Sequence, residues 1–310
     1  MKTVPPTISI LMATFNGEKY LRQQLLSLIA QTYPNWQLWI KDDGSTDTTI
    51  SIIDEFCALD PRIQKVASSE KNLGAGKAFF SLLQYSNTPY TIFCDQDDIW
   101  LEKKLEELVL YADKKLVSDK VGIVYCDAYA YSDTAGTIIS QSISHLHAKN
   151  LNEFLFFNSG YQGCSILFNR PLTEMAQNYT ADFYMHDDII SLLVHTFGDV
   201  YFLNKPLMLY RQHDNNVTGQ TSRGYLDMVR GFFRSGASVL NRHHYEEKKA
   251  FFDYYKTSML QEYNVLFEAY LDFPKAMYLK RVWIIVSNRF SIGGHQMILL
   301  IKTLLRKPLG

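Results

Sequence analysis

The sequence predicts an α/β protein with a doubly wound, mostly parallel sheet and a C-terminal helical region. Three observations lead to this fold class. Short apolar stretches alternate with segments of helical periodicity over residues 7–130, acidic or polar residues follow several of these stretches, and strand signals disappear after residue 222. Strands that alternate with helices form parallel sheets with right-handed crossovers.

The first half of the chain contains five expected strands. They cover residues 8–13, 36–41, 63–67, 90–94 and 121–126. Apolar residues at helical spacing mark a helix in each interval, with core stripes at Leu21, Leu25, Leu28 and Ile29, at Ile50, Ile53 and Phe56, at Phe79, Leu82 and Leu83, and at Leu101, Leu105, Leu108 and Ala112. The carboxyl ends of such strands meet at one edge of the sheet, where ligands bind.

The second half is less regular. We expect a strand at 163–168, a helix at 186–197 and one or two short strands within 200–210. Helices are expected at 225–240, 245–270, 274–288 and 296–306. We therefore divide the chain into an α/β domain, residues 1–219, and a helical region, residues 220–310.

Composition excludes several classes of protein. The 310 residues include 31 Lys and Arg against 32 Asp and Glu, a formal net charge of −1, which argues against a nucleic-acid binder. The four cysteines form no C-x-x-C pair, so we expect free thiols in a reducing cytoplasm. Neither a signal peptide nor an uninterrupted apolar run of 18 residues is present, so we expect a cytoplasmic protein without a transmembrane helix.

The strongest chemical signal is the run Asp95-Gln96-Asp97-Asp98, directly after an apolar strand. Three carboxylates in four positions repel one another, and a bound Mg²⁺ or Mn²⁺ relieves that repulsion. A solvated acidic turn that caps the helix after Leu101 explains the same run. The run alone leaves both interpretations open.

Two further strands end in polar residues. Asp42-Asp43 follows the second strand, where a carboxylate could accept the imide N–H of a uracil or thymine ring. Thr14 and Asn16 follow the first strand. Neither a G-x-G-x-x-G motif nor a complete P-loop is present.

Together these segments resemble the family 2 glycosyltransferases, whose fold is the GT-A type of nucleotide-diphosphosugar transferase. The likeness runs from Ile8 to about Gly219, and Asp95-Gln96-Asp97 is similar to the D-x-D motif of the family. The segments Asp95 to Trp100, Gly163 to Asn169 and Tyr210 to Val217 resemble bacterial rhamnosyltransferases of surface-polysaccharide biosynthesis.

The resemblance implies a set of site residues. The nucleotide sugar is expected to contact Thr14, Asn16, Asp43, Lys77, Asp95 and Gln96. Asp97 is the expected metal ligand, with Asp95 and His213 as further candidates. Asp187 is the expected catalytic base, with Asp188 as the alternative, although both also suit the N-terminus of a helix. Gly163, Cys164 and Trp100 are expected in the acceptor region.

The function implied is metal-dependent, inverting transfer of a sugar to a saccharide acceptor. L-rhamnose from dTDP-L-rhamnose and a lipid-linked acceptor are expected. A transferase that uses a UDP-hexose and a non-catalytic sugar-nucleotide-binding assembly protein are the alternatives.

The last 37 residues have an unusual charge pattern. From Pro274 onward there are seven basic residues and no acidic one, with apolar residues at helical spacing between them. This pattern favours contact with an anionic membrane surface. The resemblance implies an acceptor on the cytoplasmic face, so we expect the protein on the inner face of the cell membrane. Packing on the acidic catalytic domain and a homodimer interface are the alternatives.

Overall fold

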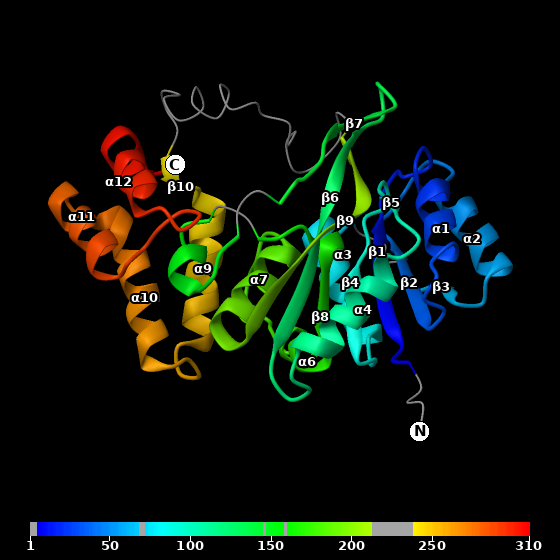
Figure 1. Ribbon diagram of the computed structural model, residues 1–310, viewed down its shortest axis with the longest axis horizontal. Coiled ribbons are helices and arrows are strands. Elements are labelled where there is room, and N and C mark those ends of the chain that lie inside the picture. The colour runs from blue at the N-terminus through cyan, green and yellow to red at the C-terminus, as the bar shows by residue number, and fades with distance from the viewer. Residues whose placement is uncertain (1–4, 68–71, 145–146, 158–159, 213–237) are drawn as a thin grey trace.

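A curled sheet with helices on both faces forms the centre of the computed structural model, and a group of helices lies at one end (Figure 1). The structure describes residues 5–67, 72–144, 147–157, 160–212 and 238–310. The described residues form a nine-stranded sheet in the order β3-β2-β1-β4-β8-β6-β9-β5, and β7 pairs with β6.

The sheet is mostly parallel. Its strands are β1 (Ile8–Thr14), β2 (Trp36–Asp42), β3 (Ile63–Lys65), β4 (Tyr90–Phe93), β5 (Ile99–Trp100), β6 (Gly122–Ser132), β7 (Thr137–Ser140), β8 (Ile166–Asn169) and β9 (Asp199–Gln212). The pairs β1–β2, β1–β4, β2–β3 and β6–β9 are parallel, whereas β8 runs antiparallel to β4 and β6.

Helices cover both faces of the sheet. The helices between strands are α1 (Leu21–Ile29), α2 (Thr49–Leu59), α3 (Ala75–Leu82), α4 (Lys104–Lys115), α5 (Leu151–Phe154), α6 (Arg170–Gln177) and α7 (His186–Phe197). Core residues of α1, α2 and α4 pack with Ile10 of β1, and those of α3, α6 and α7 pack with Leu11. Successive residues of β1 are thus buried on opposite faces, which explains its continuous apolar run.

The C-terminal helices are α9 (Arg242–Tyr255), α10 (Gln261–Asp272), α11 (Tyr278–Ser287) and α12 (Gln296–Leu305). Short 3-10 turns are η1 (Leu83–Tyr85), η2 (Gly163–Ser165) and η3 (Phe273–Lys275). The strand β10 (Ser238–Leu240) pairs in parallel with β11 (Lys307–Leu309).

The alternation of strands and helices to residue 126 is confirmed, and the helix expected at 186–197 has the predicted bounds. Other expectations were wrong in detail. The region 200–210 belongs to one long strand, β9, and the helix expected at 245–270 is two helices that break before Gln261. The end of the helix expected at 225–240 is strand β10, and residues 225–237 lie outside the described residues.

The proposed boundary at residues 219 and 220 also lies outside the described residues and stays a prediction. The described parts on either side share one apolar core, which joins Leu193 of α7 to Phe251 of α9 and Phe267 of α10. Among the described residues, no helix is long and apolar enough to cross a membrane.

The apolar residues of the last two helices divide into two sets. Ile284, Ile285 and Leu299 are buried in the shared core, so packing on the rest of the protein accounts for one face of these helices. The other face is solvent-exposed.

Candidate active site

Polar residues at the carboxyl ends of β1 and β2 hold two loops together. Thr14 and Asp42 are register partners, and the Thr14 hydroxyl donates a hydrogen bond to Asp42 (Oγ1 to Oδ1, 3.0 Å). The other oxygen of Asp42 accepts from the backbone N–H groups of Gly44 and Ser45, at 3.1 and 2.9 Å. Asp42 therefore stabilises the turn after β2. The carboxylate of Asp43 takes no part in these hydrogen bonds.

Asp43 is buried and anchors the start of α3. Its carboxylate accepts hydrogen bonds from the backbone N–H of Leu73 and of Gly74, each at 2.9 Å. These contacts orient the carboxylate, and a carboxylate offers about four lone-pair sites, so it can accept a further donor. The predicted contact with a pyrimidine ring stays a prediction.

The side chains of Asn16 and Gln96 fix the loop after β1. Gln96 makes two hydrogen bonds to the backbone of Phe15, with Oε1 accepting from N–H and Nε2 donating to the carbonyl, both at 3.0 Å. Asn16, at φ 46°, accepts from the N–H of Thr46 at 2.9 Å. The acidic loop after β4 is thereby joined to the first loop.

The acidic run forms a cluster of mutually repelling carboxylates. Partial burial and the negative charge of Asp97 raise the pKa of Asp95 to about 6. Burial and the charges of Asp95 and Asp97 also raise the pKa of Asp98 well above its usual range. Asp98 accepts from the N–H of Arg211 at 3.1 Å, but its second oxygen is buried without a hydrogen-bond partner in the described residues. This surplus of negative charge and the orphaned oxygen fit a cation.

The structure brings together a different trio from the one expected. The ligand atoms of Asp95, Asp98 and Cys164 lie within 4.8 Å of one another. Burial raises the pKa of the Cys164 thiol, which interacts with Asp95 as a hydrogen-bonded thiol. Asp97 is half-buried, and its expected metal contact stays a prediction.

Two buried cations support this cluster, and sequence reasoning gave a role to neither. Arg211 donates to the Asp97 carbonyl at 2.7 Å, to Gln23 at 2.6 Å, and pairs with Asp133. Lys104 is fully buried and donates to the Cys164 carbonyl at 2.7 Å. Its position on the apolar stripe that includes Leu101 and Leu105 was the available signal, because solvated lysines avoid such a stripe.

Asp187 lies in the first turn of α7. One of its oxygens accepts from the N–H of Asp188 at 3.0 Å, and its side chain makes no other hydrogen bond in the described part of the chain. Burial and the negative charges of Asp188 and Asp95 raise its pKa well above the usual range. A carboxylate with a raised pKa and a free oxygen is suited to accept a proton.

The turn η2 joins Asp187 to the acidic cluster. A Cβ atom added to Gly163 would lie 2.7 Å from Nε2 of His186 and 3.5 Å from Cβ of Asp187. The side chain of the next residue, Cys164, forms a hydrogen bond with Asp95. Gly163 and Cys164, which the sequence placed in the acceptor region, thus lie between the two groups of acids.

Cys164 and Trp100 themselves are buried. The Trp100 ring lies 3.8 Å from the Lys104 ammonium. Because these two side chains are buried, they could affect an acceptor only through the residues that pack on them. Their expected acceptor role stays a prediction. Lys77 is exposed on α3, and its donor contact is likewise untested. His213 lies outside the described residues.

Replacement of Gly163 by alanine is expected to lower kcat by about tenfold to 10²-fold with little change in the KM for donor. The added methyl group would press on His186, whose ring is held between Phe79 and Phe93 with centroids 4.3 and 4.6 Å away. The first turn of α7 would have to move, and Asp187 with it.

Gly122→Ala is a matched control for that measurement. Its Cβ would have the same 2.7 Å clearance, but from the flexible Leu116 side chain at the amino end of β6. Equal kinetics for the two variants would refute the link between Gly163 and the catalytic aspartate.

Asp188 belongs to a separate, buried ionic cluster. Nδ1 of His244 lies 2.9 Å from its carboxylate, and Glu247 and Lys248 of α9 lie beside it. Although burial opposes ionisation, the hydrogen bond from His244 holds the pKa of Asp188 below its usual range. Asp188 is therefore committed to an ion pair with the C-terminal region, which favours Asp187 over Asp188 as the base.

The same partners explain the pKa values of the other members. Burial alone would lower the pKa of His244, but its hydrogen bond to Asp188 raises it to about 9. Burial raises the pKa of Glu247 to about 7 and lowers that of Lys248 to about 8. The sequence analysis assigned no role to His244 and missed the cluster, because its members lie on two helices, α7 and α9, that are far apart in the chain.

Thermal stability is expected to fall between pH 7 and pH 8 through this cluster. A raised histidine pKa stabilises the folded state below the ordinary pKa of 6.5, and that stabilisation disappears as the pH rises towards 9. Glu247 also lowers the stability as the pH rises, but its effect ends near pH 7. Lys248 raises the stability as the pH rises, and its effect begins near pH 8. His244→Gln should remove a slope of up to about 1.4 kcal/mol per pH unit in the unfolding free energy. Equal slopes for the variant and the wild type would contradict the ion pair.

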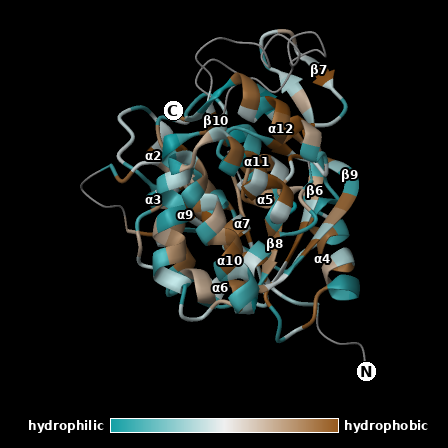
Figure 2. Cartoon of the chain, turned by 90° about the vertical axis from the view of Figure 1, so that its left-hand side faces the viewer, coloured by the Kyte–Doolittle hydropathy of each residue, from teal (hydrophilic) through white to brown (hydrophobic). Residues whose placement is uncertain are grey.

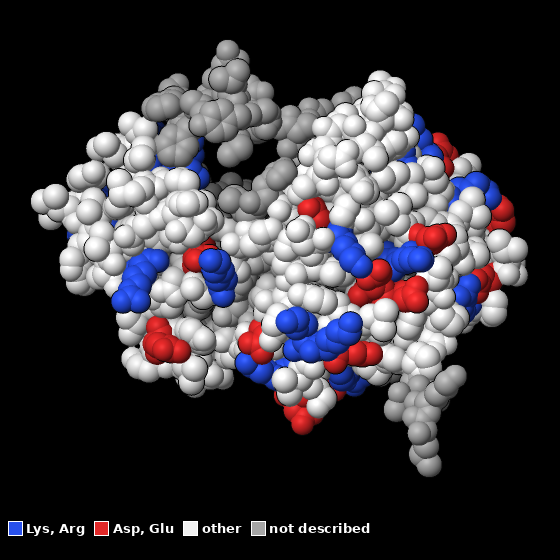
Figure 3. Space-filling view, in the orientation of Figure 1, with Lys and Arg blue, Asp and Glu red and all other residues white. Residues whose placement is uncertain are grey.

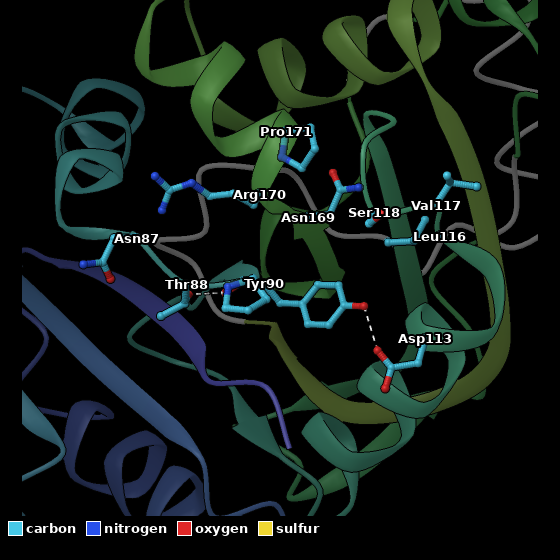
Figure 4. Close-up of a pocket in the computed structure, with 11 residues that line it drawn as sticks. Asn87, Thr88, Tyr90, Asp113, Leu116, Val117, Ser118, Asn169, Arg170 and Pro171 are labelled. Carbon is cyan, nitrogen blue, oxygen red and sulfur yellow. Dashed lines mark hydrogen bonds between the residues drawn. The ribbon is translucent and has the colours of Figure 1, made fainter. Parts of the chain in front are cut away.

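One hollow in the described part of the chain lies away from these residues. A cavity of about 550 Å³ opens at the amino end of β4, where Tyr90 donates to Asp113 at 2.8 Å (Figure 4). Asn169, which pairs with Tyr90 in the sheet, lines the same cavity. This end of the strand is opposite to the acidic cluster, so the cavity is not part of the candidate active site.

Comparison with known proteins shows the family of this chain. Residues 9–174 match the family described as Glycosyl transferase family 2. A dTDP-rhamnosyl transferase of Shigella flexneri is 31% identical over 223 residues, which cover 67% of this chain and 73% of the relative. A UDP-Glc:alpha-D-GlcNAc-diphosphoundecaprenol beta-1,3-glucosyltransferase of Escherichia coli is 36% identical over 115 residues, or 37% of this chain and 44% of the relative.

Solved structures share the fold at low sequence identity. S. aureus TarS in complex with UDP-GlcNAc aligns with a TM-score of 0.59 at 15% identity, over 91% of this chain and 80% of the other. A mannosyltransferase from Pyrobaculum calidifontis in complex with GDP-Man and Mn²⁺ aligns with a TM-score of 0.54 at 12% identity, over 97% and 87%. These likenesses confirm the predicted GT-A type of fold.

Proposed function

The chain belongs to glycosyl transferase family 2, and we propose that it transfers L-rhamnose from dTDP-L-rhamnose to a saccharide acceptor in bacterial surface-polysaccharide biosynthesis. The dTDP-rhamnosyl transferase of Shigella flexneri supports this donor, and a UDP-hexose is the alternative. The diphosphoundecaprenol acceptor in the name of the Escherichia coli relative supports a lipid-linked acceptor. We propose the cytoplasmic face of the cell membrane as the place of reaction.

The single observation that carries this proposal is the turn η2 between the acidic cluster and Asp187. Gly163 packs against the first turn of α7, and Cys164 contacts Asp95. Burial and the negative charges of Asp188 and Asp95 together raise the pKa of Asp187. A donor diphosphate bound at the cluster and an acceptor hydroxyl bound at Asp187 would then both lie next to η2.

The acidic cluster is suited to a divalent cation, Mg²⁺ or Mn²⁺. We propose that Asp97 and Asp95 hold it, with the orphaned oxygen of Asp98 close by and His213 as a further candidate. Hard carboxylate oxygens are the ligands that these ions prefer. A cation bound there would neutralise charge on the leaving diphosphate.

The remaining steps fall to side chains of this chain. Asp43, Thr14 and Asn16 would hold the nucleotide, with Gln96 fixing the loop after β1. Asp187 would accept the proton of the acceptor hydroxyl while that oxygen attacks the anomeric carbon. A single base and a direct attack give inversion at that carbon.

Donor identity is tested by binding, in the presence of Mn²⁺ or EDTA, of dTDP-L-rhamnose, dTDP-glucose, UDP-glucose and GDP-mannose. We expect dTDP-L-rhamnose to raise the melting temperature most, and only when Mn²⁺ is present. If UDP-glucose raised the melting temperature more than dTDP-L-rhamnose, we would assign a UDP-hexose as the donor. Binding without release of nucleoside diphosphate in the presence of lipid-linked acceptors would favour a non-catalytic binding protein.

A further inference from the structure

The last two helices carry apolar side chains on two opposite faces. On α11 and α12, Ile284, Ile285 and Leu299 are buried. The outward face bears a second stripe, which consists of Leu279, Trp283 and Val286 on α11 and Met297, Ile301 and Leu304 on α12. We call these six residues the outer apolar face.

The outer apolar face is strongly exposed. Leu279 is 80% exposed, Trp283 64% and Leu304 64%. The residues recur at spacings of three and four, so each set lies along one side of its helix. A helix that is apolar on both sides has a second surface to cover, because soluble proteins rarely leave large contiguous apolar patches in water.

The two helices pack together at one end of the molecule. They contact each other directly, and both carry hydrophobic segments in the view of that end (Figure 2). In the space-filling view, the upper left part of the surface, over α11 and α12, is mostly free of charged atoms (Figure 3). The lower half of the same view shows interspersed basic and acidic residues.

The charges of the C-terminal segment distinguish between the possible partners of the outer apolar face. Lys275, Arg289 and Lys307 are exposed in the same C-terminal segment, and residues 274–310 contain no acidic residue. On α11, Lys280 forms an ion pair with Asp272 at 2.7 Å. A second copy of the chain would bring the same cations face to face, because a two-fold interface joins identical patches. Anionic headgroups above an acyl layer complement both the cations and the apolar stripe.

We propose that the outer apolar face of α11 and α12 binds the surface of an anionic lipid bilayer. Trp283 and Leu304 enter the interface between headgroups and acyl chains, and the exposed lysines and arginine contact lipid phosphates. The binding is peripheral, since neither helix is long enough to cross the bilayer. The surface is separate from the proposed donor and acceptor sites, so the proposal does not depend on the identity of the donor.

The test is co-sedimentation of the full chain with vesicles of phosphatidylcholine alone or of phosphatidylcholine with phosphatidylglycerol, at low and high salt. We expect binding to the phosphatidylglycerol vesicles that weakens with salt. The double variant Trp283→Ser, Leu304→Ser should lower the partition coefficient about tenfold or more, since two apolar side chains no longer enter the bilayer. Both residues are exposed, so the folded state loses little packing.

Leu59→Ser is the matched control, because Leu59 is 65% exposed at the end of α2, at the opposite end of the molecule (Figure 1). It should bind vesicles as the wild type does. Unchanged binding by the double variant, or no binding by the wild type at low salt, would overturn the proposal. A dimer in sedimentation velocity that the double variant converts to monomer would also overturn it, since the face would then cover a second copy. None of these outcomes involves donor turnover, so they are distinguishable from a failure of the proposed function.

Discussion

Replacement of Asp187 by asparagine is expected to lower the rate of sugar transfer by about 10²-fold or more, the usual range for loss of a general base. The substitution keeps the size of the side chain but removes the oxygen that would accept a proton. Donor binding should be unchanged, because Asp187 lies on α7 and not at the strand ends that are expected to hold the nucleotide. Single-turnover transfer and donor affinity, measured on the same preparation, separate the two effects.

Asp188→Asn is the neighbouring control. It removes the charge that pairs with His244 but keeps the size of the side chain. We expect a lower melting temperature and a smaller loss of transfer than for Asp187→Asn. If the Asp187 variant remained active while a folded Asp188 variant did not, the base would have to be reassigned to Asp188.

Asp97→Asn is expected to lower metal-dependent transfer by about 10²-fold or more, because a metal that stabilises the leaving group contributes several kcal/mol to the barrier. The melting temperature should change little, since Asp97 is only half-buried. Rates are measured as a function of Mn²⁺ concentration for the wild type and the variant.

Asp98→Asn distinguishes the two ways of holding the ion. Asp98 is buried and accepts from the Arg211 backbone, so its loss should affect both stability and metal binding. Full activity of the Asp97 variant at the Mn²⁺ concentration that saturates the wild type would exclude Asp97 as a ligand. If the Asp98 variant were inactive while the Asp97 variant was active, we would assign the metal to Asp95, Asp98 and Cys164.

Local patterns in the sequence were sufficient for the first half of the fold. The strands β1, β2 and β4 are apolar because both faces of the sheet are covered, and their ends carry the polar residues that meet at one edge. The direction of β8 could not be predicted in this way. An antiparallel strand between β4 and β6 has the same apolar composition as a parallel one, and only the path of the chain distinguishes them.

The candidate site was predicted where the residues are close in sequence and missed where they are distant. The acidic run is visible because Asp95, Asp97 and Asp98 lie within four positions. The partnership of Asp188 with His244 joins α7 to α9 across 56 positions of chain, and no local pattern indicates it. Lys104 was visible only as a misplaced charge on an apolar stripe, and its hydrogen bond to the Cys164 carbonyl depends on the tertiary fold.

Product analysis tests the central claim most directly. The metal-saturated wild type is incubated with dTDP-L-rhamnose and a lipid-linked saccharide acceptor, and both products are identified by NMR. We predict one equivalent of dTDP for each sugar transferred and an inverted configuration at the anomeric carbon, with no reaction in EDTA. Retention of configuration, or release of dTMP with rhamnose 1-phosphate, would contradict the account, because the first excludes direct attack assisted by Asp187 and the second breaks a different bond.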